Sequence, residues 1–216
     1  MNTVIFDMDG LLIDSEMISY QMYQDLLSRY GQRLSIEEYG KIYSGRTAVK
    51  NMEELIKQFH LPVTFEEGMR ITMEIEMECF HRGVALKPGA RELIQYLKTK
   101  GYKIILATSS TEERARIALQ YQQIENDFDE MVFGYEVEHG KPAPDIFLKA
   151  CEKAQEPVEN CLVLEDSEAG IQAAYNAHIP VICVPDMKKP AEKFAALTVG
   201  VVASLQDVIF YLEKGL

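Results

Sequence analysis

Hydrophobic and polar positions change their spacing twice along this chain of 216 residues. Residues 3–6 form a short, continuous run of β-branched and aromatic side chains, which is typical of a strand buried on both faces. From residue 15 to about residue 82, apolar residues recur at helical spacing, and no strand-like run interrupts them. From residue 90 onward helical and strand-like segments alternate, and this alternation favours a parallel sheet with helices packed on it.

The helical stretch divides into four predicted helices. Ser35, with Glu38 three residues later, forms a capping box that begins the second of them. The predicted spans of the other three are residues 15–30, 49–59 and 64–82. In the last helix Met69, Met73 and Met77 recur every four residues, and we expect this methionine stripe to pack in the core of the helical unit.

The alternating stretch completes the predicted fold. Its predicted strands are residues 103–107, 131–133, 161–164, 180–184 and 199–202, and its predicted helices are residues 90–100, 112–122, 143–154, 168–177, 190–197 and 205–213. The first strand has the composition of this sheet but precedes the helical stretch. We therefore predict an α/β fold with a doubly wound parallel sheet, formed by the discontinuous residues 1–14 and 85–216, and an all-α domain of residues 15–84 inserted into it.

The charge of the chain restricts its partners. The formal net charge is −12 at pH 7, and such a field repels polyanions, so we do not expect nucleic acid or an anionic membrane as a partner. No apolar run approaches the length that spans a membrane. A phosphate-binding site in this chain would need a local source of positive potential, such as a metal ion with one or two lysines.

The cysteines bear on the compartment. Cys79, Cys151, Cys161 and Cys183 form no C-x-x-C pair and show no spacing with histidine that is typical of a zinc site. Unpaired cysteines fit a reducing cytosol, and no signal peptide is evident. We therefore expect a cytoplasmic protein, and nothing in the sequence requires more than a monomer.

Four polar clusters carry the candidate chemistry. They are Asp7-Met8-Asp9-Gly10, Thr108-Ser109-Ser110, Gly140-Lys141-Pro142 and Glu165-Asp166-Ser167. Three of them directly follow strand-like runs, and ligands of parallel α/β sheets bind at the carboxyl ends of the strands. Two ionised acids at the end of a buried strand need a cation or hydrogen-bond donors to compensate them.

Each cluster alone also has an ordinary structural explanation. A D-x-D sequence is common in loops, and Lys141 could be one of many solvated lysines. The Thr-Ser-Ser and Glu-Asp-Ser clusters could simply cap the helices that follow them. The occurrence of all four, three of them at predicted strand ends, favours a functional site over four unrelated structural features.

Together these clusters closely resemble the haloacid-dehalogenase-like hydrolase superfamily. The segments D-M-D-G-L-L-I-D-S-E, G-K-P-A-P-D-I-F and L-E-D-S-E-A-G-I match its β-phosphoglucomutase-like phosphatase branch. The resemblance covers essentially the whole chain, and the helical insert resembles the cap domain of that branch. It implies a Mg²⁺-dependent phosphatase that hydrolyses small phosphorylated metabolites, such as sugar phosphates or nucleotide-like monoesters, through an aspartyl-phosphate.

The resemblance also implies a role for each acid. Asp7 would be the nucleophile and a metal ligand. Asp9 would protonate the leaving group and then activate water, and its backbone carbonyl would contact the metal. Asp166 would hold Mg²⁺ together with Asp7, and an all-oxygen site with few protein ligands suits this ion. Glu165 would be either a further ligand or an outer-shell acid.

The remaining clusters would handle the phosphate. A phosphate ester repels nucleophiles by its own charge, so its hydrolysis needs charge neutralisation as well as an oriented nucleophile. Thr108 resembles the phosphate-binding hydroxyl of the family, with Ser109 or Ser110 assisting. Lys141 resembles the lysine that neutralises nucleophile and phosphate together.

Other functions remain open on the sequence. A dehalogenase of this superfamily would lack the second acid, so Asp9 argues against it. A sugar phosphomutase of this branch carries a cap histidine where this chain has Ser19, and an arginine a few residues after the cap-loop glycine, whereas Arg46 follows Gly45 directly. Both departures favour a phosphatase. A catalytically inactive binding protein would be expected to lack at least one of the acids or Lys141.

Arg46 is the candidate for substrate specificity in the helical insert. It follows a loop glycine between two predicted helices, and its guanidinium could bind a substrate hydroxyl, carboxylate or phosphate. The alternative is a solvated loop arginine without a role in binding.

Overall fold

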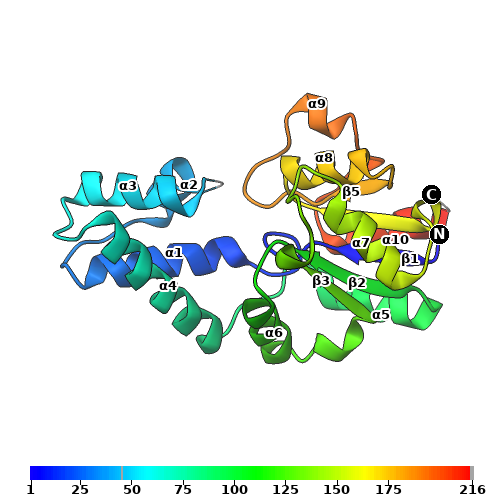
Figure 1. Ribbon diagram of the computed structural model, residues 1–216, viewed down its shortest axis with the longest axis horizontal. Helices are drawn as coiled ribbons and strands as arrows, with labels where there is room; N and C mark the ends of the chain where they lie inside the picture. The colour runs from blue at the N-terminus through cyan, green and yellow to red at the C-terminus, as the bar shows by residue number, and fades with distance from the viewer. Residues whose placement is uncertain (45, 215–216) are drawn as a thin grey trace. The chain divides into compact units, whose positions relative to one another are not determined.

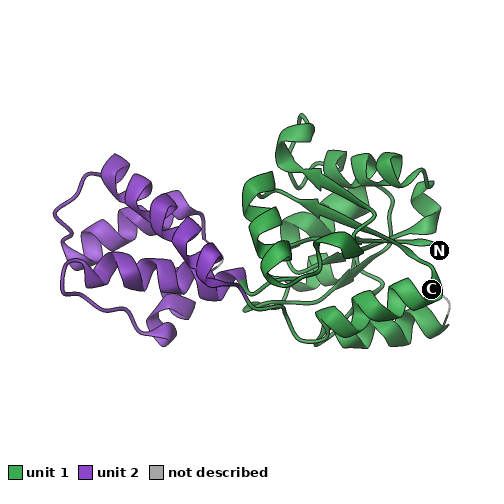
Figure 2. Cartoon of the chain, turned by 90° about the horizontal axis from the view of Figure 1, so that it is seen from below, with its two compact units in different colours: residues 1–14, 85–216 green, residues 15–84 purple. Residues whose placement is uncertain are grey.

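The structure, a computed structural model, describes residues 1–44 and 46–214. The chain forms two compact units (Figure 2). The first consists of Met1–Asp14 and Ala85–Leu216, and the second consists of Ser15–Val84.

The first unit is built on one six-stranded sheet (Figure 1). Its strands are β1 (Thr3–Phe6), β2 (Lys103–Thr108), β3 (Glu130–Phe133), β4 (Cys161–Glu165), β5 (Val181–Cys183) and β6 (Gly200–Val201). They lie in the order β3-β2-β1-β4-β5-β6, and every neighbouring pair is parallel. The predicted doubly wound α/β sheet is therefore confirmed, and β1 lies at its centre, where the strand order reverses.

Helices cover both faces of this sheet (Figure 2). They are α5 (Ala90–Lys100), α6 (Glu112–Tyr121), α7 (Asp145–Ala154), α8 (Glu168–Asn176), α9 (Glu192–Ala195) and α10 (Leu205–Lys214), with three short 3₁₀ turns at Glu125–Asp127, Gly134–Glu136 and Val158–Asn160. Ile5, Ile105 and Val163 form one hydrophobic cluster with Phe147 of α7 and Ile171 of α8. Because strand side chains alternate between faces, the intervening residues of β1, β2 and β4 point toward the opposite face. Burial on both faces explains why these strands read as continuous apolar runs.

The described residues of the second unit form four helices, as predicted. They are α1 (Ser15–Ser28), α2 (Ile36–Ile42), α3 (Ala48–Phe59) and α4 (Phe65–Arg82). The predicted capping box of Ser35 and Glu38 begins α2, and Thr64 with Glu67 forms a second capping box at the start of α4. These pairs satisfy backbone N–H groups that would otherwise lack partners at the helix starts.

The predicted burial of the methionine stripe in α4 is wrong for Met73, whereas Met69 and Met77 are half-buried. Met73 is 64% exposed, and the buried face of α4 consists of Gly68, Thr72, Ile75, Cys79 and Phe80. Four residues turn a helix by 400°, so a stripe repeated every four residues drifts around the helix. From Gly68 to Cys79 the buried residues are four, three and four positions apart, and Phe80 adjoins Cys79, which keeps the set on one side.

The two chain crossings between the units run beside each other. The Asp14 N–H donates to the Ala85 carbonyl at 2.9 Å, and the Lys87 N–H donates to the Leu12 carbonyl at 2.9 Å. The backbone of the two crossings thus forms one short antiparallel pairing. It joins the end of residues 1–14 to the start of residues 85–216 within the sheet unit.

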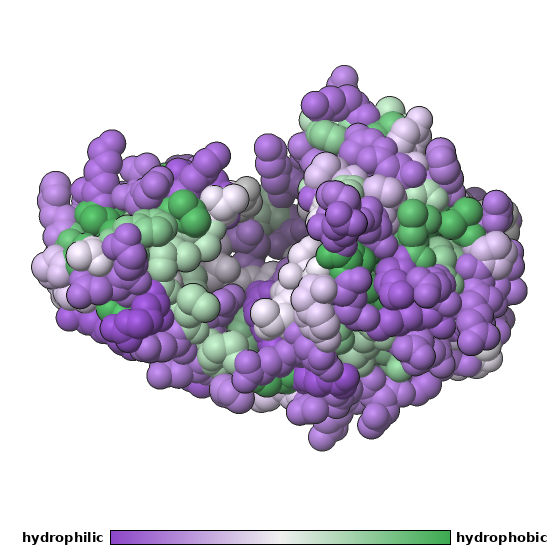
Figure 3. All heavy atoms as spheres, viewed as in Figure 1, coloured by the Kyte–Doolittle hydropathy of each residue, from purple (hydrophilic) through white to green (hydrophobic). Residues whose placement is uncertain are grey.

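Polar side chains cover most of the face of each unit that Figure 3 presents. Within the described residues, the structure contains no helix with the length and apolar character needed to cross a membrane.

Candidate active site

Asp7 and Lys141 form the centre of the candidate site. Asp7 directly follows β1, and its backbone N–H donates to the Leu164 carbonyl of β4. Asp7 is buried, with only 6% of its surface exposed. The Lys141 Nζ lies 2.5 Å from Asp7 Oδ1 and 2.6 Å from Glu165 Oε1. Lys141 precedes α7, so the chain brings an ammonium group from a loop onto two strand-end acids. Burial alone would lower the pKa of Lys141, but the two carboxylates raise it above its usual value.

Glu165 uses both of its carboxylate oxygens within the protein. Oε1 accepts from Lys141, while Oε2 accepts from the backbone N–H groups of Asp166 and Ser167 and from the Ser167 hydroxyl, at 2.9–3.0 Å. The residue is completely buried. Its carboxylate therefore joins the lysine to the loop that carries Asp166.

Asp166 lies beside Asp7 in a cluster of acids. Asp7, Glu165 and Asp166 each offer a carboxylate oxygen, and these three atoms lie within 4.8 Å of one another. Gly10 has φ +81°, and a Cβ atom there would lie 2.4 Å from Asp166 Oδ2. Only glycine combines this left-handed conformation with the space that Asp166 occupies. The glycine of the first cluster therefore lets the loop after β1 approach Asp166 closely.

The three carboxyl groups of this cluster can carry more negative charge than the Lys141 ammonium neutralises. Burial raises the pKa of Asp7 to about 7; the Lys141 ammonium opposes this rise, and the Glu165 and Asp9 carboxylates add to it. Burial likewise raises the pKa of Asp166 to about 9, with Glu165 and Asp7 as further causes. Such shifts identify carboxylates that need additional positive charge to ionise near neutral pH. All three candidate ligands offer oxygen, which suits a hard divalent cation.

Asp9 is held by two residues that follow β2, Ser110 and Arg114. Its Oδ2 accepts from the Ser110 hydroxyl at 2.6 Å and from Arg114 Nη1 at 3.0 Å, and its Oδ1 lies 2.8 Å from Arg114 Nη2. Sequence reasoning missed Arg114, which lies in the first turn of α6, 105 residues from Asp9. Ser110 precedes the N-cap Thr111 and is not part of the helix, so no helical spacing in the sequence links it to Arg114.

The three hydroxyl residues at the end of β2 differ in their burial and in their contacts. Thr108, the last residue of β2, is 1% exposed, and its hydroxyl accepts from the Ser110 backbone N–H at 3.0 Å. Ser110 contacts Asp9, whereas Ser109 is exposed. The three hydroxyl residues thus lie at the same sheet edge as Asp7, with Thr108 the most deeply buried.

Lys87 and Asp186 form a second charged pair that sequence reasoning missed. The Lys87 Nζ lies 2.5 Å from Asp186 Oδ1, and both side chains are mostly buried. A Cβ atom at Gly10 would lie 3.3 Å from Asp186 Oδ2, so this acid flanks the same loop as Asp166. Asp186 is a lone aspartate in the loop after β5, and no sequence motif around it could have identified it.

Arg46 belongs to the second unit. Its Nη1 donates to the Ile42 carbonyl at 2.9 Å, and the residue lines a pocket of about 140 Å³ within this unit. Tyr23, Tyr39 and Tyr43 contribute to the same pocket. Gly45, which precedes Arg46 in the predicted specificity loop, lies outside the described residues.

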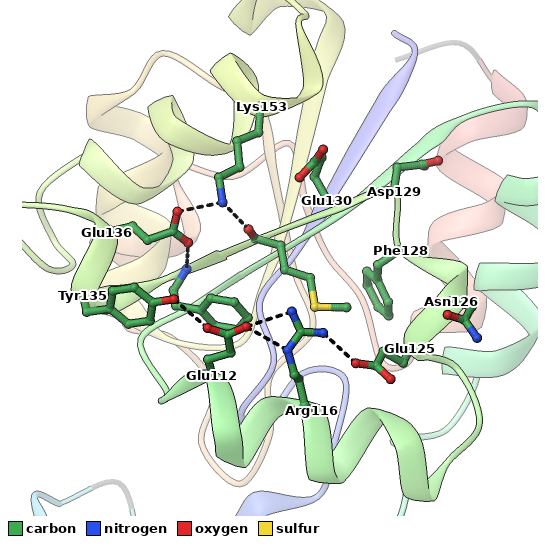
Figure 4. Close-up of a pocket in the computed structure, with 12 residues that line it drawn as sticks. Glu112, Arg116, Glu125, Asn126, Phe128, Asp129, Glu130, Tyr135, Glu136 and Lys153 are labelled. Carbon is green, nitrogen blue, oxygen red and sulfur yellow. Dashed lines mark hydrogen bonds and ion pairs between the residues drawn. The ribbon is translucent and has the colours of Figure 1, made fainter.

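A larger groove of about 570 Å³ lies at the β3 edge of the sheet (Figure 4). Its basic side chains are already paired: Arg116 contacts Glu112 and Glu125, and Lys153 contacts Glu136. Among the residues that line this groove, both cationic side chains therefore already have carboxylate partners.

Known proteins resemble the whole of this chain. Residues 4–184 match the haloacid dehalogenase-like hydrolase family. A phosphorylated carbohydrates phosphatase of Thermotoga maritima is 32% identical over 100% of this chain and 92% of its own length. A (DL)-glycerol-3-phosphatase of Arabidopsis thaliana is 32% identical over 94% of this chain and 70% of its own length. A crystal structure from Thermotoga maritima, of a protein provisionally titled a β-phosphoglucomutase, has a TM-score of 0.88 and 29% identity over the full length of both chains.

The fold, the strand-end acids and these matches define a class of enzyme, the phosphoric monoester hydrolases. The chain belongs to the haloacid dehalogenase-like hydrolase family, as the four clusters predict.

Proposed function

We propose that this phosphatase is Mg²⁺-dependent, that it hydrolyses small phosphorylated metabolites such as sugar phosphates or nucleotide-like monoesters, and that it does so through an aspartyl-phosphate on Asp7. The observation that carries the proposal is the contact of the buried Asp7 carboxylate with Lys141, with Asp166 close beside it. An oriented carboxylate next to a fixed cation provides the nucleophile and the charge neutralisation that phosphoryl transfer requires.

The reaction would proceed in two displacements. An Asp7 oxygen forms a bond to phosphorus, the ester P–O bond breaks, and the leaving oxygen takes the electron pair together with a proton from Asp9. A water molecule then attacks the same phosphorus, Asp9 accepts its proton, and the bond to Asp7 breaks to release phosphate. Asp9 can serve both steps because general acid and general base are the two protonation states of one carboxyl group.

Lys141 and Thr108 would bind the phosphoryl group. The Lys141 ammonium, fixed by Asp7 and Glu165, provides a compact positive charge beside the reacting oxygen. The Thr108 hydroxyl accepts from a backbone N–H, which leaves its own hydrogen to donate to a phosphoryl oxygen. Ser109, exposed at the same strand end, would assist.

The acidic cluster fits a divalent cation. Asp7 and Asp166 would hold Mg²⁺ from adjacent strands, with the Asp9 backbone carbonyl as a third ligand. The contacts of Glu165 support its role as an outer-shell acid over that of a direct ligand, because Lys141 and the loop after β4 already engage both of its oxygens. When bound, the ion supplies the additional positive charge that the raised pKa values of Asp7 and Asp166 indicate is needed.

The second unit would act as a cap that selects the substrate. Its pocket combines three tyrosines with Arg46, groups that suit the hydroxyls of a sugar or polyol. Arg46 already donates to a backbone carbonyl, so it would contribute its remaining donors.

The test is phosphate release from a broad panel of phosphate monoesters, measured with Mg²⁺ and after chelation. We expect wild-type protein to release phosphate from sugar or nucleotide-like phosphates only in the presence of Mg²⁺. Asp7→Asn should abolish turnover while leaving the circular dichroism spectrum unchanged. A panel that yields no phosphate with wild-type protein, or an active Asp7→Asn variant, would contradict the proposal.

A sugar phosphomutase is the second candidate function. The likeness to the structure provisionally titled a β-phosphoglucomutase favours it, whereas Ser19, in place of a cap histidine, argues against it. Incubation with β-glucose 1-phosphate and its bisphosphate activator distinguishes the two. Formation of glucose 6-phosphate would identify a mutase, and release of inorganic phosphate alone would identify a phosphatase.

A further inference from the structure

Arg114 engages both oxygens of the Asp9 carboxylate. Nη1 donates to Oδ2 at 3.0 Å, and Nη2 lies 2.8 Å from Oδ1. The Ser110 hydroxyl, which contacts Arg114 Nη1 as well, donates to Oδ2 at 2.6 Å. One hydrogen bond to Oδ2 and an ion pair with Oδ1 let the planar guanidinium restrict both the position and the orientation of this carboxylate.

Asp9 has a cation of its own, separate from the one that Asp7 and Glu165 share. Lys141 contacts Asp7 and Glu165, and no hydrogen bond from Lys141 to Asp9 is formed among the described residues. Arg114 is thus the cation of Asp9, as Lys141 is the cation of Asp7. The Arg114 side chain is 16% exposed and the Asp9 side chain 31% exposed, so the pair lies at the rim of the site, where solvent screens it only in part.

We propose that Arg114 is a positioning residue for the phosphatase reaction, which acts by holding Asp9 in the orientation needed for proton transfer. The inference rests on the proposed function, because it requires Asp9 to be the group that moves the proton. Without Arg114, one hydroxyl would hold Asp9, and the carboxylate could rotate about its two side-chain bonds. Proton transfer requires a heavy-atom separation of about 2.6–3.2 Å, so a rotated carboxyl group would transfer its proton slowly.

This role differs from phosphate binding in what it predicts. A guanidinium that bound the phosphoryl group would strengthen the binding of inorganic phosphate and speed the first displacement with every substrate. A guanidinium that acts through Asp9 affects only the steps that move a proton. The two roles can be separated by the choice of substrate. The p-nitrophenolate leaving group departs without a proton, whereas an alkoxide leaving group needs one.

The experiment compares wild-type protein with Arg114→Gln, Arg114→Lys and the matched control Arg116→Gln. Arg116 lies on the same helix, and its contacts are with Glu112 and Glu125 at the groove of Figure 4. Three quantities are measured with Mg²⁺: turnover of the sugar or glycerol phosphate that wild-type protein hydrolyses fastest, the pre-steady-state burst of p-nitrophenolate, and the inhibition constant of inorganic phosphate.

We expect Arg114→Gln to lower turnover of the alkyl phosphate about 100-fold, the lower range of general acid–base catalysis. The nitrophenolate burst rate and the phosphate inhibition constant should stay within about twofold. Arg114→Lys, which keeps the charge but loses the two-point contact, should recover part of the turnover. Arg116→Gln should match wild-type protein in all three quantities.

Three outcomes would overturn the inference in a folded, active protein: unchanged alkyl phosphate turnover in Arg114→Gln, a burst rate that falls in parallel with turnover, or a phosphate inhibition constant that rises tenfold. Should Arg114→Gln fail to fold, as judged by circular dichroism, Arg114→Lys decides by the same criteria. If wild-type protein is inactive on the whole panel, the proposed function is contradicted, and the inference about Arg114 is then rejected as well.

Discussion

The Glu165 carboxylate occupies the space that a side chain at Gly170 would need. A Cβ atom at residue 170 would lie 1.7 Å from Glu165 Oε1 and 2.4 Å from Oε2. The first turn of α8 therefore approaches the acid that joins Lys141 to the loop carrying Asp166. Gly170, three residues after the last cluster, is therefore a packing requirement of this carboxylate and thus of the site.

Gly170→Ala should destabilise the protein and reduce activity together. The added methyl group forces either the helix or the fully buried Glu165 to move, and overpacking of this kind costs about 1–3 kcal/mol. Urea denaturation measures the loss in the free energy of unfolding, and phosphate release measures the loss of activity. Gly140→Ala is the control for stability, since nothing lies within 4 Å of its added Cβ atom. Equal stability of the two variants would show that Glu165 moves aside without cost.

Lys141→Met should nearly abolish activity. The substitution leaves Asp7 and Glu165 buried together without their shared cation, and removal of one charge-stabilising donor from an active site commonly costs a factor of about 100–1,000 in turnover. Breaking a buried pair also destabilises the fold, by about 3–5 kcal/mol in other proteins. Lys188→Met, the same change at an exposed lysine, should match wild-type protein in both measurements. More than a tenth of wild-type turnover in Lys141→Met would exclude the role assigned to this ammonium.

The sheet and its strand-end residues were predictable, whereas the contacts between elements were not. Parallel strands end at one edge, so a sequence that places Asp7, Thr108 and Asp166 directly after apolar runs brings them together. Arg114 meets Asp9 only because α6 returns over the end of β2, and no local pattern encodes that path. Met73 was misassigned to the core because regular spacing identifies a helix but not which side it buries.

The stability of the metal-free protein should fall as the pH rises from about 4 to 9. The pKa values of Asp7 and Asp166 in the folded protein, about 7 and about 9, lie above the value of about 3.9 in an unfolded chain. Between these values the folded state binds more protons than the unfolded state, so the free energy of unfolding decreases with pH. Thermal or urea denaturation with a chelator, between pH 5 and pH 8, measures this slope.

Mg²⁺ should counteract this loss of stability. The ion binds the ionised acids of the folded state and competes with their protons, so its stabilising effect should be larger at pH 8 than at pH 5. Asp166→Asn should reduce both the slope of the metal-free protein and the response to Mg²⁺, which separates this cluster from other titrating groups. A metal-free stability that stays constant or rises over this range would contradict the assignment of the excess charge to these acids.

Asp9→Asn should discriminate between substrates by their leaving groups. The amide cannot donate the proton that an alkoxide requires, so turnover of sugar phosphates should fall at least about 100-fold. The burst of p-nitrophenolate should fall much less, because this leaving group departs as a stable anion and its release depends on Asp7 and Lys141. Rapid-mixing measurement of nitrophenolate, with steady-state phosphate release from a sugar phosphate, gives both rates. Asp127→Asn, at an exposed pair with Lys98, is the matched control and should leave both unchanged. Equal losses on the two substrates would mean that Asp9 supports the fold of the loop rather than proton transfer, and the role of Arg114 would need to be reassigned with it.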